Sequence, residues 1–121
     1  MRLVKNDVSA FYGYCLVTVV PTIFNHFQVM MYVWNDTLQY YRSCEVGAKT
    51  PSFAQALHWA ADWAMDHTDT MICLGSHVID LNDNCHMPDA GEIMRYLKRT
   101  LSKEEWYQIE NLYLCGTPNG Q

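Results

Sequence analysis

The residues whose side chains could bind a metal gather in the second half of the chain. Four of them lie within fourteen residues: Cys73, His77, Cys85 and His86. A zinc ion needs such donors to converge at about 2.0–2.3 Å. Cys73 and His77 would share a face if residues 71–80 formed one strand. However, the spacing matches no known zinc motif, and the adjacent Cys85 and His86 are poorly placed to bind one ion. We therefore expect no metal and no cofactor, and keep a small metal- or ligand-binding domain as an alternative.

The same side chains could also serve a small cysteine–histidine enzyme, because a thiolate nucleophile needs only a neighbouring base. With five cysteines and five histidines in the chain, some such pair is always available. The sequence contains no GxSxG motif, no HExxH motif and no Gly-rich phosphate or dinucleotide loop. We therefore assign no catalytic residue and expect no enzymatic activity, with the cysteine–histidine enzyme kept as an alternative.

Acidic residues are concentrated in one segment. Residues 57–92 carry seven Asp or Glu and no Lys or Arg, within a chain of net charge −5. Asp62, Asp66 and Asp69 form a stripe late in a predicted helix, where each carboxylate opposes the helix dipole by about 0.3–1 kcal/mol. Trp59 lies beside this stripe and could anchor an interface. A solvated helix face, the default for an amphipathic helix, explains the stripe, and a surface that meets a basic protein partner is the functional alternative.

These features favour a non-enzymatic protein-binding module or inhibitor. Basic side chains share a face of a later helix at Arg95, Lys98 and Arg99, but the net negative charge disfavours direct nucleic-acid binding. A small acidic domain fits an inhibitor that occupies the nucleic-acid-binding surface of its partner. Phage-encoded inhibitors of host defence complexes, anti-CRISPR proteins among them, have a similar size and charge, which is an analogy only. The sequence is also compatible with a homodimer.

The bulk composition indicates one compact domain over residues 1–121, with a frayed tail at 117–121. Half of the residues are apolar and 17% are charged, which is typical of a folded globular chain. No stretch reaches the roughly 20 apolar residues that span a membrane. The five cysteines are odd in number and dispersed, so we expect reduced thiols and a cytoplasmic protein.

The hydrophobic pattern predicts an antiparallel β-meander followed by helices. Strands are expected at 11–20, 26–34 and 38–44, with a tight turn at Asn35-Asp36 and a loop at 45–49. Thr50 and Pro51 are suited to begin a helix that reaches about His67 and buries one arc of small and aromatic side chains.

A fourth strand is expected at 71–80, followed by two helices. Asp89 can cap the helix that runs to Thr100, and Ser102 with Glu105 forms a capping box for the last one, which is expected to end at Cys115-Gly116. The predicted fold class is therefore α+β, an antiparallel β-meander with packed helices in the order βββαβαα.

Overall fold

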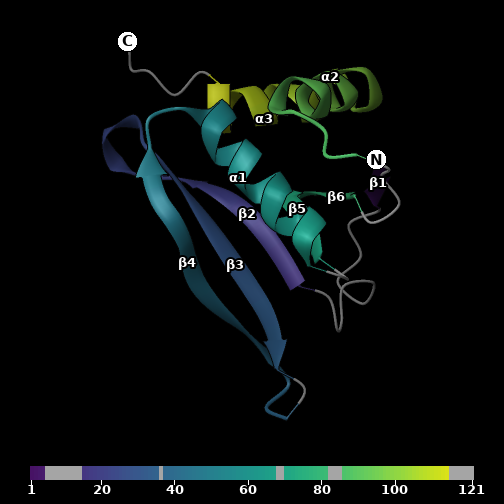
Figure 1. Cartoon of the computed structure of the whole chain (residues 1–121). Coiled ribbons are helices and arrows are strands. Elements are labelled where there is room, and N and C mark those ends of the chain that lie inside the picture. Colours follow the sequence, from purple (N-terminus) through teal and green to yellow (C-terminus); the bar gives the residue numbers. More distant parts are fainter. Residues whose placement is uncertain (5–14, 36, 68–69, 82–85, 115–121) are drawn as a thin grey trace.

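The fold combines one sheet with a layer of helices. A computed structural model describes residues 1–4, 15–35, 37–67, 70–81 and 86–114 (Figure 1). Within these ranges the chain forms a six-stranded sheet and three α-helices, so the predicted α+β class is confirmed. The strands are β1 (Arg2–Val4), β2 (Cys15–Pro21), β3 (Phe27–Asn35), β4 (Tyr40–Thr50), β5 (Thr70–Leu74) and β6 (His77–Asp80).

The predicted meander corresponds to β2, β3 and β4, which pair antiparallel in sequence order. The full strand order is β1-β6-β5-β2-β3-β4. β5 pairs parallel with β2, so the sheet as a whole is mixed rather than purely antiparallel. This parallel pairing is available because helix α1 (Phe53–Asp66) carries the chain from β4 back across the sheet (Figure 1).

Residues 71–80 do not form the single strand that the sequence predicts. The chain turns at Gly75 and Ser76, and β5 and β6 pair antiparallel with Leu74 opposite His77 and Cys73 opposite Val78. Gly75 has a φ of +61°, a left-handed conformation that glycine adopts without a steric penalty. The apolar run continues on both sides of this turn, and for that reason the pattern resembles one strand.

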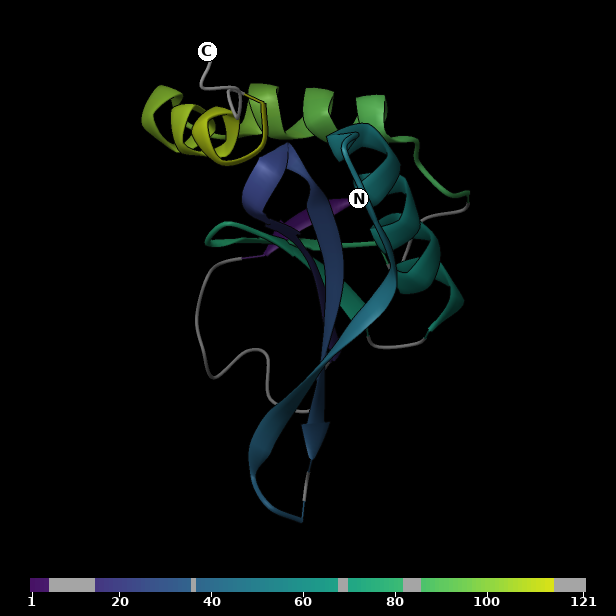
Figure 2. The ribbon, with the colours of Figure 1, turned by 90° about the vertical axis from the view of Figure 1, so that its left-hand side faces the viewer.

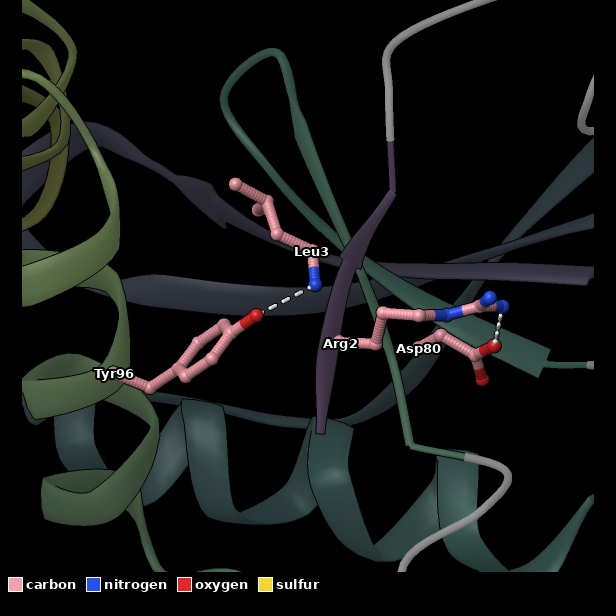
Figure 3. Close-up of polar contacts among 4 residues, drawn as sticks. All are labelled: Arg2, Leu3, Asp80 and Tyr96. Atoms are coloured by element: carbon pink, nitrogen blue, oxygen red, sulfur yellow. Dashed lines mark hydrogen bonds and ion pairs between the residues drawn. The ribbon is translucent and has the colours of Figure 1, made fainter.

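Strand β1 is an edge strand that the sequence does not reveal. It pairs antiparallel with β6 and is held at both sides by polar contacts (Figure 3). The Arg2 guanidinium lies 2.7 Å from an Asp80 carboxylate oxygen, and the Leu3 backbone N–H donates to the Tyr96 hydroxyl at 2.8 Å. These contacts attach the N-terminal strand both to its neighbour in the sheet and to helix α2 (Ala90–Thr100).

The main core lies between the sheet and the helices. α1 packs across one face of the sheet, and α2 and α3 (Lys103–Ile109) cross one end of the molecule (Figures 1 and 2). Of the six side chains predicted to form the buried arc of α1, Trp63 is half-buried and the other five are buried: Phe53, Ala56, Leu57, Ala60 and Ala64. The largest fully buried side chains are Leu57, Ile72, Leu74, Ile79, Leu81, Ile93, Leu97, Ile109, Val17, Val19 and Val29.

The second face of the sheet is also apolar, although no described α-helix lies flat across it (Figure 2). Along β2, Val17 and Val19 are buried toward α1, whereas Leu16, Thr18 and Val20 alternate onto the second face and are half-buried. A sheet face in contact with water normally carries polar side chains. The main core therefore does not account for the apolar side chains on the second face.

Helix capping agrees with the sequence at two of three positions. Asp89 and Ser102 cap α2 and α3 as predicted, and Ser102 forms the predicted capping box with Glu105. Asp89 also forms a capping box, with Glu92, which was not predicted. The first helix, in contrast, is capped by Ser52, whose hydroxyl accepts from the Gln55 N–H at 3.1 Å. Thr50, the predicted cap, is the last residue of β4. The prediction is wrong there because β4 is longer than expected.

Two further boundaries differ from the predictions. The expected loop at 45–49 is part of β4, which continues through Gly47 at a φ of +77°, near a register shift against β3. The last helix continues beyond α3 as a π-helical segment, η3 (Glu110–Leu114). The predictions for 11–14, Asp36, Cys115-Gly116 and the tail lie outside the described residues. None of the described helices is long and apolar enough to cross a bilayer.

Candidate functional site

The outer side of α1 carries the acidic stripe that the sequence predicts. Asp62 and Asp66 are both exposed, one helical turn apart, while the opposite side of the helix is buried against the sheet. Trp59 is half-buried beside them, as expected of a residue at the edge of the apolar arc. We call Trp59, Asp62 and Asp66 the acidic face. Asp69 lies outside the described residues.

The two carboxylates of the acidic face have no ion-pair partner among the described residues. The ion pairs found there join Arg2 to Asp80, His77 to Glu105 and His86 to Glu92. α1 also has no basic residue in its last turn. Among the described residues, the negative charge at this end of the helix is therefore balanced neither by a neighbouring Lys or Arg nor by the helix dipole.

An aromatic pair lies at the C-terminal end of α1. The rings of Trp63 and His67 stack with their centroids 4.2 Å apart and their planes 13° apart. His67 Nδ1 lies 2.8 Å from the Trp63 carbonyl oxygen, so this nitrogen must carry the proton that it donates. The contact satisfies one carbonyl at the helix end and leaves the imidazole exposed.

The candidate metal ligands do not converge. Leu74 and His77 face each other across the β5–β6 hairpin, and Leu74 is fully buried in the main core, so His77 points to the helix side. Cys73 is paired with Val78 on the second face. His86 is exposed near Glu92, and Cys85 lies outside the described residues. No group of three or more possible metal ligands occurs in the described part of the chain.

The environment of Cys73 keeps the thiol protonated. Burial raises the pKa of Cys73 above its ordinary value. Its hydrogen-bond partner is the Gly75 carbonyl oxygen at 3.4 Å, which cannot act as a base for the thiol proton. A nucleophilic cysteine needs the opposite environment, with a neighbouring base or a lowered pKa. Cys15, Cys44 and Cys73 are free thiols.

The second sheet face holds a feature that the sequence does not indicate. The hydroxyl of Tyr113, from η3, accepts a hydrogen bond from the Gly75 N–H at 3.2 Å and is hydrogen-bonded to Thr18. These residues come from three distant segments, so no local pattern could have linked them. Together with Cys73 they place four polar groups beside one pocket of about 460 Å³.

Known proteins provide no further guide to this site. The chain matches no family model, no curated protein and no solved structure.

Proposed function

We propose that this protein is a non-enzymatic binding module that docks a basic protein partner through the acidic face of α1. The observation that carries the proposal is the exposure of Asp62 and Asp66 without a described cationic neighbour, beside a half-buried tryptophan. Exposed carboxylates steer association with a basic surface, and a tryptophan can supply the apolar anchor of an interface.

The energetics of the helix support this assignment. The two carboxylates oppose the helix dipole by about 0.3–1 kcal/mol each and repel one another by a few tenths of a kcal/mol. The folded chain gains nothing from them through burial, because both side chains are exposed. A charge pattern that destabilises its own helix is reasonable if a partner supplies the missing cations.

The acidic face also suggests a more specific function, that of an inhibitor. A basic surface that binds nucleic acid attracts carboxylates for the same reason that it attracts phosphates. We propose that the acidic face occupies such a surface on the partner, as phage-encoded inhibitors of host defence complexes do. The chain would then compete with the nucleic acid of its partner without contacting nucleic acid itself.

The test compares two double variants with the same charge change. Asp62→Lys/Asp66→Lys reverses the acidic face, and Glu45→Lys/Glu104→Lys reverses two exposed carboxylates elsewhere. Partners captured by the wild type are identified by mass spectrometry, and their association rates are then measured between low and physiological salt. We expect the first variant to lower the association rate at least tenfold and the control to lower it far less.

Stability separates this effect from unfolding. Reversing Asp62 and Asp66 removes an unfavourable dipole interaction, so the free energy of unfolding should be unchanged or slightly higher. Normal binding of the Asp62→Lys/Asp66→Lys variant at low salt would reject the acidic face as the docking surface. Equal losses in both double variants would show that only net charge matters.

A further inference from the structure

A pocket of about 460 Å³ opens on the second face of the sheet, where η3 reaches over the strands. Its apolar walls come from Leu16 and Val20 of β2 and from Leu112 of η3. This volume falls within the range of small-molecule sites, about 300–1,000 Å³. The apolar second face therefore contains a pocket of the size of a ligand site. This pocket is separate from the acidic face, which lies on the other side of the sheet.

Polar groups converge inside the pocket. Thr18, Cys73 and Tyr113 all line it, and the Tyr113 hydroxyl accepts from the Gly75 N–H at 3.2 Å. The other hydrogen-bond partner of the Tyr113 hydroxyl is the Thr18 side chain. A phenol oxygen can accept two hydrogen bonds, so with Thr18 as the second donor the phenol would keep its own O–H proton for another acceptor.

The described lining of the pocket carries no formal charge. No Asp, Glu, Lys, Arg or His is among the described residues that line it. Burial raises the pKa of both Tyr113 and Cys73, so both stay protonated at neutral pH. An ionised ligand would lose its hydration here without gaining a counter-ion, which is strongly unfavourable.

We propose that this pocket binds a neutral, mainly apolar small molecule whose carbonyl or ether oxygen accepts a hydrogen bond from Tyr113. Three properties of the pocket define this class of ligand: its volume, its apolar walls and the Tyr113 hydroxyl that lines it. Because the pocket and the acidic face are different surfaces, this inference does not depend on the proposed function.

The probe is PRODAN, an uncharged naphthyl ketone whose emission shifts to the blue in an apolar site. Two neighbouring leucines of η3 provide matched variants, since Leu112 and Leu114 are 42% and 47% exposed and Leu112 alone of the two lines the pocket. We expect one PRODAN to bind per wild-type chain. Leu112→Trp should weaken binding at least tenfold, and Leu114→Trp should change it less than twofold.

The hydrogen bond is tested with a ketone, 2-acetylnaphthalene, and a matched hydrocarbon, 2-ethylnaphthalene, as competitors. Losing one hydrogen bond weakens binding by about five- to tenfold. The wild type should therefore prefer the ketone by that factor, and Tyr113→Phe should abolish the preference while still binding the hydrocarbon. Because this is a ratio within one variant, it does not depend on how much folded protein each preparation contains.

Several results would overturn the proposal. They are the absence of saturable PRODAN binding, an equal effect of Leu112→Trp and Leu114→Trp, or an unchanged ketone preference in Tyr113→Phe. The anion 2-naphthoate competing as strongly as the ketone would reject a neutral ligand. If PRODAN fails to bind and sedimentation shows a dimer that Leu112→Trp dissociates, the occupant is a second copy of this chain.

Discussion

Replacing Tyr113 with phenylalanine tests how the last segment of the chain is attached to the sheet. Tyr113 is 5% exposed, and its ring stacks on Phe53 with centroids 4.6 Å apart. The hydroxyl links η3 to the β5–β6 turn through Gly75 and to β2 through Thr18. Tyr113→Phe removes these hydrogen bonds and keeps the ring in place.

The expected loss follows from the partners that remain. A hydrogen bond contributes about 0.5–1.5 kcal/mol net, and an unsatisfied buried donor costs about 1–3 kcal/mol. Gly75 is exposed, so water can replace the lost acceptor of its N–H. We therefore expect Tyr113→Phe to lower the free energy of unfolding by about 1–2 kcal/mol. Tyr113→Ala also removes the stacked ring and should cost about 3–5 kcal/mol.

Urea unfolding followed by tryptophan fluorescence measures both values, provided that the slope of the transition stays constant. Tyr107→Phe is the matched control, because Tyr107 is 61% exposed and its change should stay within about 0.5 kcal/mol. If Tyr113→Phe costs as much as Tyr113→Ala, the hydroxyl rather than the ring attaches η3. If both variants match the wild type, Tyr113 is not packed as described.

Two further predictions concern the same region. Gly75→Ala places a Cβ 3.3 Å from Leu112 Cδ1 at a φ of +61°, so it should lower the free energy of unfolding by more than about 1 kcal/mol. Gly47→Ala should cost less, because no atom of the described residues lies within 4 Å of the new Cβ there. Equal losses in urea unfolding would contradict the contact between the Gly75 position and Leu112. Burial raises the pKa of Tyr113 above its ordinary value of 10.0. As pH rises, the Tyr113 hydroxyl therefore loses its proton in the unfolded chain before it does so in the folded chain. The contribution of protonated Tyr113 to the free energy of unfolding is complete below about pH 10 and is lost as pH rises through the pKa of the folded state. Unfolding from pH 8 to 11 should show the advantage of the wild type over Tyr113→Phe shrinking above pH 10, and a constant difference would show that Tyr113 titrates normally.

The helices could be predicted because their signals are local. The buried arc of α1, the cap at Asp89 and the capping box of Ser102 each depend on residues within a few positions of one another. The exposure of Asp62 and Asp66 follows from the same periodicity. A helix face can be read from sequence because its hydrogen bonds do not involve another segment.

Strand pairing and the pocket could not be predicted in this way. The parallel contact between β2 and β5 joins residues that are more than 50 positions apart, such as Leu16 and Met71. The pocket needs that pairing first, because it sets Thr18 next to Cys73 on the second face. A Gly-Ser pair between apolar runs does favour a two-residue hairpin turn, so the break at Gly75-Ser76 had a signal in the sequence.

Features that lower stability without serving the fold also support a binding function. The turn between β2 and β3 exposes Ile23 and Phe24 by 76% and 81%. Phe24 adopts a φ of 63°, although a left-handed backbone costs a residue with a side chain about 1–2 kcal/mol. Its side chain gains almost no burial in return. Asp62 and Asp66 show the same relation on α1, where exposed charges oppose the helix dipole. Selection for stability alone would favour glycine at the position of Phe24 and lysine at the end of α1. The residues found there are explained if selection acts on what this surface contacts.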